Sequence, residues 1–253
     1  MPQRSIGCIA MLINSFSSSV KIKLVYHRRH DYFEMNMAKN SYPVGEHALL
    51  IPGPAGQLEA ILTIPEIIGP KVIGLVCHPH PLHGGTMNNK VVNTVCRSLR
   101  EVGIINLRFN FRGVGKSTGE FADGIGETGD ASACISWLQH QWPEAKLWLV
   151  GFSFGAYVAY KTSLAVASQC LVCIAPPVHH YDFASLALPS CPWWVLQPDA
   201  DEIVPVQQVL AWINNINPKP QLIRFAETSH FFHGKLIILR QTLIDIWRNA
   251  IAS

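Results

Sequence analysis

The stretch that most constrains this chain is Gly151-Phe152-Ser153-Phe154-Gly155, which joins a short apolar run to an Ala-rich run. This pattern predicts a strand that turns sharply into a helix. Gly151 and Gly155 flank the Ser because strand and helix backbones pass close together there, and a Cβ would clash. Ser153 would then present its hydroxyl beside free N–H groups at the helix N-terminus, which can bind a developing oxyanion. Because the pattern is short, a Gly-rich turn with an ordinary Ser is the alternative.

Composition excludes several classes of protein. A chain of 253 residues with 49% hydrophobic and 15% charged residues predicts one large globular α/β domain. The net charge of +3 is dispersed and gives no basis for nucleic-acid binding. No apolar run reaches the roughly 18 residues that a membrane span needs. Seven Cys, several within apolar runs, are typical of buried residues in a reducing cytoplasm, which predicts a cytoplasmic protein.

Residues 1–41 differ from the rest of the chain. Short apolar runs alternate there with a Ser run and a Met-rich polar patch, and residues 4–13 only weakly resemble a signal peptide. We expect a disordered or irregular extension, with an upstream translated start as one explanation. Met35 or Met37 would then be the native start, and residues 1–36 would not belong to the native protein. The organised domain is expected at 42–253.

From residue 42 onward, apolar runs of strand length alternate with helical patterns. Runs at 46–51 and 57–64, separated by a Pro/Gly turn, predict an antiparallel hairpin. Further strands are predicted at 72–77, 104–109, 147–150, 171–175, 193–196 and 222–225, and helices at 88–102, 128–142, 154–167, 206–213 and 235–250. Alternation of this kind predicts a mostly parallel sheet with helices on both faces.

In such sheets, functional residues gather beyond the carboxyl ends of the strands. Ser153, Asp201 and His230 each follow a predicted strand, in that chain order. Together they are typical of a Ser–acid–His catalytic triad, in which the His takes the Ser proton and the acid orients the imidazole.

The chain from about Gly45 to its end resembles the α/β-hydrolase superfamily, and is most similar to its small, cap-poor bacterial members. The resemblance rests on the loops His-Pro-His-Pro-Leu-His-Gly-Gly at 78–85, Asn-Phe-Arg-Gly-Val-Gly at 110–115 and Gly-Phe-Ser-Phe-Gly-Ala at 151–156. It implies a serine hydrolase that acts through an acyl-enzyme, without cofactor or metal. A carboxylesterase on small or mid-sized soluble acyl substrates is expected first, and a thioesterase or peptidase next. The short segment at 176–190 leaves no room for a helical cap.

The resemblance also assigns roles. It makes Ser153 the nucleophile in a nucleophile elbow, Asp201 the orienting acid and His230 the base. The oxyanion hole would combine the N–H groups of Phe154 and His80. Pro79 stands where the family usually has Gly, which puts the His80 donor in question.

Alternatives remain for two of these residues. Asp199 competes with Asp201, although the family pattern, which ends in Val-Pro at 204–205, favours Asp201. His233 competes with His230, although His-Phe at 230–231 fits the pattern better.

Other functions are also open. The run Gly115-Lys116-Ser117 resembles the end of a phosphate-binding loop, but Asn110 replaces its first Gly and no helical pattern follows. A metal-dependent hydrolase is a second possibility, with zinc ligands from the His at 78, 80, 83, 179, 180 and 230 and from Asp199 or Asp201. A non-catalytic binding protein on the same fold is a third.

Overall fold

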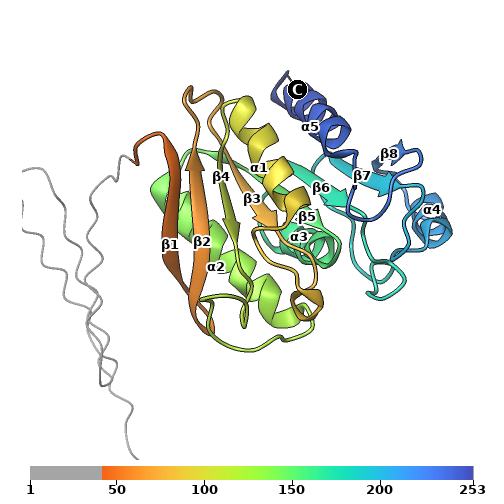
Figure 1. Cartoon of the computed structure of the whole chain (residues 1–253), viewed down its shortest axis with the longest axis horizontal. Coiled ribbons are helices and arrows are strands. Elements are labelled where there is room, and N and C mark those ends of the chain that lie inside the picture. Colours follow the sequence, from red (N-terminus) through yellow and green to blue (C-terminus); the bar gives the residue numbers. More distant parts are fainter. Residues whose placement is uncertain (1–41, 253) are drawn as a thin grey trace, which may run out of the picture. The chain divides into compact units, whose positions relative to one another are not determined.

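The computed structural model describes residues 42–252, in which one eight-stranded sheet carries helices on both faces (Figure 1). The predictions for residues 1–41 lie outside the described residues. The strands are β1 (Gly45–Gly53), β2 (Gly56–Ile64), β3 (Val72–Cys77), β4 (Ile105–Phe109), β5 (Lys146–Phe152), β6 (Cys170–Ile174), β7 (Trp193–Pro198) and β8 (Gln221–Phe225). The α-helices are α1 (Lys90–Glu101), α2 (Ile125–Gln141), α3 (Phe154–Ala165), α4 (Val206–Asn214) and α5 (Leu236–Ala252), and a 3-10 turn, η1, covers Pro81–His83.

The strands lie in the order β1-β2-β4-β3-β5-β6-β7-β8. β1 and β2 form the predicted antiparallel hairpin, and β2 also pairs antiparallel with β4. The six strands from β4 to β8 in this order are parallel. The prediction of a mostly parallel sheet with an N-terminal antiparallel hairpin is therefore confirmed.

Two apolar layers hold the helices against the sheet. α2 and α3 cover one face with residues such as Leu138 and Ala159, and α1 and α5 cover the other with residues such as Leu99 and Leu243 (Figure 1). β3, β5 and β6 read as near-continuous apolar runs because both of their faces are buried. β4 is also buried, but Asn106 and Arg108 alternate with its apolar residues. Within residues 42–252, no helix is long and apolar enough to span a bilayer.

The cysteines are part of these layers. The six described cysteines are all free and buried. Cys170 and Cys173 belong to opposite faces of the sheet, as their spacing within a strand predicts. Burial raises the pKa of the Cys96 thiol to about 12, so this thiol stays protonated at neutral pH.

The N-terminus of α2 differs from its prediction, since the helix begins at Ile125 rather than at residue 128. Gly124 adopts φ 81°, and the Glu127 carboxylate accepts the backbone N–H groups of Ala122 and Gly124, both at 2.8 Å. This cap satisfies donors that have no acceptor within the helix. The first turn carries no apolar periodicity, which is why the sequence pattern missed it.

His78 connects the carboxyl ends of β3 and β4. Its Nδ1–H donates to the Pro79 carbonyl oxygen at 2.6 Å, and its Nε2 accepts the Phe111 N–H at 3.0 Å. Only a neutral imidazole can both donate and accept in this way. Burial, helped by neighbouring His80 and opposed by the hydrogen bond to the Pro79 carbonyl, lowers the pKa of His78 to about 3. A neutral, buried imidazole therefore shapes the loop that follows β3.

The state of His78 should make stability depend on pH. Between a native pKa of about 3 and an unfolded pKa of about 6.5, only the unfolded chain binds a proton at this site. His78 thus destabilises the fold as pH falls below about 6.5, by up to roughly 1.4 kcal/mol per pH unit. We expect His78→Gln to lose part of this slope. Urea unfolding followed by circular dichroism between about pH 4.5 and 6.5 measures it, and parallel stability curves would contradict the prediction.

Candidate active site

Ser153 lies at the sharp turn between β5 and α3. It has φ 54° and ψ −122°, a conformation that few residues other than Gly adopt. A Cβ on Gly151 would collide with the Gly155 carbonyl, and a Cβ on Gly155 would collide with the Cys77 carbonyl of β3. The predicted sharp turn is therefore present, with the glycines where the backbones touch. The Ser153 N–H donates to the Ile174 carbonyl of β6 at 2.8 Å, which helps to hold this conformation.

The two predicted oxyanion donors lie at the ends of neighbouring strands. Phe154 is the first residue of α3, where a backbone N–H has no intrahelical acceptor. The His80 backbone N–H donates no hydrogen bond to any residue of 42–252. The His80 and Phe154 rings are in contact, with centroids 5.1 Å apart. Pro79 stands where the family usually has Gly. Proline lacks its own backbone N–H, but the N–H of the next residue, His80, is still present as the expected oxyanion donor.

Asp201 and His230 are paired in the structure. His230 Nδ1 lies 2.9 Å from Asp201 Oδ2 and 3.1 Å from Oδ1, and both side chains are almost fully buried. Asp201 Oδ1 also accepts the backbone N–H groups of Ile203 at 2.9 Å and Val204 at 2.7 Å. Burial alone would raise the pKa of Asp201, but the hydrogen bonds outweigh it and hold the pKa below its ordinary value. The carboxylate is therefore ionised at neutral pH and can orient the imidazole.

The competing acid and base lie elsewhere. Asp199 forms an ion pair with Arg224 of β8 at 2.8 Å and does not contact His230. His233 is exposed, and its backbone N–H donates weakly to the Ser229 hydroxyl at 3.4 Å. Of the two predicted acids, Asp201 is the one that geometry pairs with His230.

The remaining link runs from Ser153 to His230. In this structure no hydrogen bond joins the Ser153 hydroxyl to the His230 ring. Phe152, which precedes Ser153, packs its ring against the His230 imidazole with centroids 4.9 Å apart. Ser153 and His230 therefore lie in the same part of the structure. Catalytic hydrogen bonds between a Ser and a His are often long before substrate binds.

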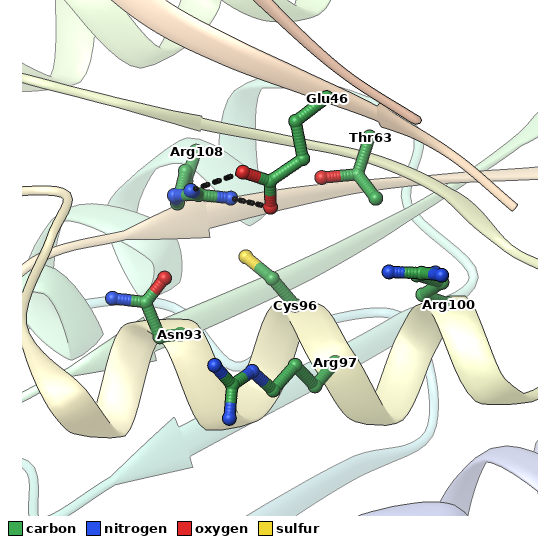
Figure 2. Close-up of a pocket in the computed structure, with 7 residues that line it drawn as sticks. All are labelled: Glu46, Thr63, Asn93, Cys96, Arg97, Arg100 and Arg108. Carbon is green, nitrogen blue, oxygen red and sulfur yellow. Dashed lines mark hydrogen bonds and ion pairs between the residues drawn. The ribbon is translucent and has the colours of Figure 1, made fainter. Parts of the chain in front are cut away.

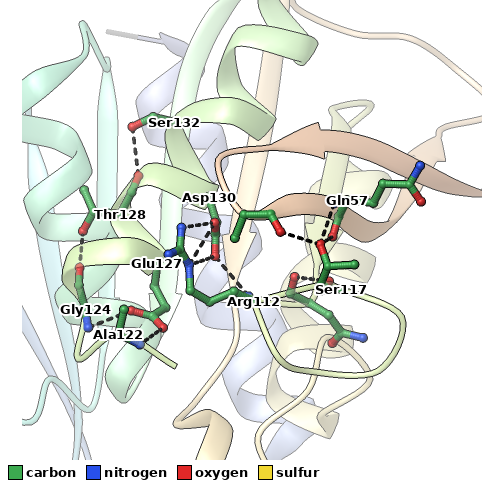
Figure 3. Close-up of polar contacts among 12 residues, drawn as sticks. Gln57, Arg112, Ser117, Ala122, Gly124, Glu127, Thr128, Asp130 and Ser132 are labelled. Atoms are coloured by element: carbon green, nitrogen blue, oxygen red, sulfur yellow. Dashed lines mark hydrogen bonds and ion pairs between the residues drawn. The ribbon is translucent and has the colours of Figure 1, made fainter. Parts of the chain in front are cut away.

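The loop after β4 is held by internal contacts. Arg112 donates from Nη2 to Asp130 Oδ1 at 2.7 Å and from Nε to Oδ2 at 3.0 Å, and the Asp130 side chain is fully buried (Figure 3). The Ser117 hydroxyl donates to the Asn110 carbonyl at 2.7 Å and accepts the Glu59 N–H of β2. Arg112 therefore ties the loop to α2, and the Ser that resembled a phosphate-binding residue is engaged within the chain.

A row of aromatic rings forms one side of the site. Ring centroids lie 4.9 Å apart for His80–Phe121, 5.7 Å for Phe121–Phe154, 5.5 Å for Phe154–Tyr181 and 4.5 Å for Tyr157–Tyr181. We call these five residues the aromatic wall. The buried Tyr181 hydroxyl has no hydrogen-bond partner among the described residues. Within the wall, Phe154 and Tyr181 are buried, and the His80, Phe121 and Tyr157 side chains are partly exposed.

The histidines of the predicted zinc set have other contacts. Both ring nitrogens of His78 are engaged, and His80 stacks on His83 with centroids 4.4 Å apart. Within residues 42–252, no three His, Cys, Asp or Glu side chains are placed to share a metal ion.

Two residues that support the site were missed in the sequence. His78 was considered only as a metal ligand, although it shapes the loop that carries the His80 N–H. Glu202 accepts the His230 backbone N–H at 3.0 Å and so helps to fix the position of the His230 main chain. The only sequence signal for Glu202 was its position next to Asp201. Two adjacent acidic residues do not indicate which of them contacts the His230 backbone.

The chain is similar to several known proteins. The family described as serine aminopeptidase, S33, matches residues 80–190. An uncharacterised protein of Rickettsia prowazekii is 40% identical over 196 residues, which are 72% of this chain and 81% of that protein.

Three solved structures are similar. A lid-less α/β serine hydrolase of Xanthomonas campestris is 44% identical, with a TM-score of 0.79 over 82% of this chain and 96% of that one. An α/β serine hydrolase homologue of Coxiella burnetii is 47% identical, with a TM-score of 0.78 over 81% and 99%. An esterase of Pyrococcus furiosus is 19% identical, with a TM-score of 0.68 over 81% and 93%, and shows the shared fold alone.

Residues 175–192, where a lid would be inserted between β6 and β7, contain no helix. Together with identities above 40% over most of both chains, this shows that the chain belongs to the α/β-hydrolase family, among its members without a lid.

Proposed function

We propose that this protein is a carboxylesterase that hydrolyses small or mid-sized, water-soluble acyl substrates through an acyl-enzyme on Ser153. The single observation that carries the proposal is the buried Asp201–His230 pair, with Nδ1 and Oδ2 at 2.9 Å, beside a Ser in a strained turn. With Nδ1–H donating to Asp201, the His230 Nε2 is left as the acceptor that a general base requires.

In the proposed mechanism, His230 takes the proton of the Ser153 hydroxyl as Ser153 Oγ attacks the ester carbonyl. The carbonyl oxygen becomes an oxyanion, which the backbone N–H groups of Phe154 and His80 would stabilise. His230 then gives the proton to the leaving alcohol, and an acyl-Ser153 ester remains. A water activated by His230 would hydrolyse this ester and regenerate the free Ser.

The absence of a lid supports the proposed substrate class. Lipases cover a long apolar groove with a lid, whereas here residues 175–192 form irregular structure without a helix. The esterase of Pyrococcus furiosus that shares the fold adds a precedent for ester hydrolysis on it.

Variants of Ser153 and Asp201, with a matched variant of Asp199 as control, test this function. Ser153→Ala should abolish hydrolysis of p-nitrophenyl butyrate and labelling by a fluorophosphonate probe. Asp201→Asn should lower kcat by about 10³-fold or more, because the imidazole loses its orientation and its tautomer. The matched control Asp199→Asn, which breaks only the ion pair with Arg224, should stay within about threefold of wild type.

Three other outcomes of these experiments would contradict the assignment of the acid or favour a different function. Equal losses from the two Asp variants would contradict the assignment of the acid. Stoichiometric zinc in the purified protein, with no labelling of Ser153, would favour a metal-dependent hydrolase. A folded protein without turnover on any ester, thioester or p-nitroanilide would favour a binding protein.

Chain-length preference tests the substrate class. We expect kcat/KM to be higher for p-nitrophenyl acetate and butyrate than for laurate by about tenfold or more, since no lidded groove buries the additional methylenes. Steady-state kinetics below the micelle concentration of each ester measures this. A rate that rises with chain length would contradict an esterase for short acyl groups.

A further inference from the structure

Gln197 is a buried polar residue to which the proposed mechanism gives no role. It lies near the carboxyl end of β7, after a run of apolar residues, and no part of it is exposed to solvent. Buried polar side chains in folded proteins are nearly always hydrogen-bonded, so the contacts of this amide matter. Because Gln197 has no exposed surface, it cannot touch a substrate. Any effect that it has on a reaction is therefore exerted through its neighbours.

The Gln197 amide lies beside the acid of the candidate triad. Its Nε2 donates to the Pro198 carbonyl oxygen at 3.0 Å, and it also lies 3.5 Å from Asp201 Oδ2, which makes a second, longer hydrogen bond. Asp201 Oδ2 is the same atom that lies 2.9 Å from His230 Nδ1. The Gln197 amide oxygen has no partner among the described residues. The residue thus leaves its acceptor unsatisfied while its donor group serves the carboxylate.

The groups that hold Asp201 carry no fixed positive charge. Oδ1 accepts the backbone N–H groups of Ile203 and Val204, and Oδ2 receives the Gln197 amide and the His230 ring. Within residues 42–252, Asp201 forms no ion pair with Lys or Arg, and its ionic partner is His230. Uncharged donors fix the direction of the carboxylate and leave its negative charge available. That charge can then stabilise the imidazolium that forms when His230 takes a proton.

Other carboxylates in this fold are held differently. Arg108 donates from both Nη atoms to Glu46 at 3.0 and 3.2 Å (Figure 2), and Arg112 pairs with the buried Asp130. In each case the guanidinium largely cancels the charge of the carboxylate, which suits a structural contact. An arginine in place of Gln197 would cancel the charge that the triad needs, whereas an apolar residue would offer no donor.

The base is held by the same loop that carries the acid. Glu202 follows Asp201 directly, and its Oε2 accepts the His230 backbone N–H at 3.0 Å. Two consecutive residues thus hold both parts of His230, since Asp201 binds the ring and Glu202 binds the main chain. The ring also packs on Phe152, with centroids 4.9 Å apart.

We propose that Gln197 and Glu202 are positioning residues of the candidate triad, an inference that rests on the proposed function. Gln197 holds the Asp201 carboxylate with Oδ2 toward the imidazole, and Glu202 holds the main chain of His230. With acid and base fixed before substrate binds, little of the activation free energy is spent on orienting them. Loss of either support therefore lowers kcat and leaves KM almost unchanged.

Gln197→Met tests the support of the acid, because Met has nearly the same size and no amide. We expect kcat on p-nitrophenyl butyrate to fall by about tenfold, with KM within about twofold of wild type, because a misplaced catalytic group is costly. Urea unfolding of the variant checks that the protein is folded in the assay. The matched control Gln221→Met removes an amide from the neighbouring strand β8, where its oxygen accepts the Trp194 Nε1–H at 3.1 Å, and should leave kcat unchanged.

Two variants of Glu202 test the support of the base. Glu202→Ala removes the acceptor and should lower kcat by about tenfold. Glu202→Gln keeps an oxygen that can accept the same N–H, so kcat should return to within about threefold of wild type. The matched control Glu227→Gln removes one exposed charge from the loop that carries His230, and should leave kcat unchanged.

A readout that needs no turnover is the proton NMR signal of His230 Nδ1–H, which lies far downfield when this proton is held by a carboxylate. It can be recorded on the inactive Ser153→Ala protein. In that background, Gln197→Met and Glu202→Ala should shift or broaden the signal, and Gln221→Met and Glu227→Gln should leave it in place.

These measurements separate the positioning roles from the proposed function. A wild-type kcat and an unchanged signal in Gln197→Met would overturn the role of Gln197, and equal kcat values for the two Glu202 variants would overturn that of Glu202. A raised KM with unchanged kcat would overturn both roles. A wild-type protein that hydrolyses no ester, but whose downfield signal still responds to Gln197→Met and Glu202→Ala, would contradict the proposed function and support the positioning roles.

Discussion

The close contact between the N-terminus of α3 and the ends of β3 and β5 is the constraint on which the rest of this structure depends. Gly151 and Gly155 allow the backbones to touch, and no side chain fits between them. The contact forces Ser153 to φ 54° and brings the loop that carries the His80 N–H beside Phe154. The same packing that joins helix to sheet therefore assembles the first half of the candidate site.

The second half is held by polar contacts as well as by apolar packing. Asp201 receives two backbone N–H groups as well as the His230 ring, and Glu202 holds the His230 backbone. Arg112 and Asp130 do the same for the loop after β4. The loops at this edge of the sheet also bury apolar side chains such as Phe111, Val204 and Phe232. Buried, paired charges give them a fixed geometry, and removal of one partner is costly.

The antiparallel hairpin supports the candidate active site from a position outside the parallel part of the sheet. From β2, Glu59 accepts the Asn110 amide at 2.8 Å and the Lys116 N–H at 2.9 Å, and so supports the loop beside the candidate active site. Glu46 of β1 also pairs with Arg108 of β4 at 3.0 Å, and so ties the hairpin to the parallel strands.

The sequence by itself determined the strands, the hairpin, the sharp turn at Ser153 and the order Ser–Asp–His. Each of these depends on local periodicity or on glycines at a turn, which residues close in the chain decide. The tertiary structure decided which side chains meet. It paired Asp201 with His230 and Asp199 with Arg224, and it made His78 a neutral link between two loops rather than a metal ligand. These partners come from strands up to 33 residues apart in the chain, and their contacts follow from the order of strands in the sheet. That order depends on how the helices cross and pack, which no local pattern specifies.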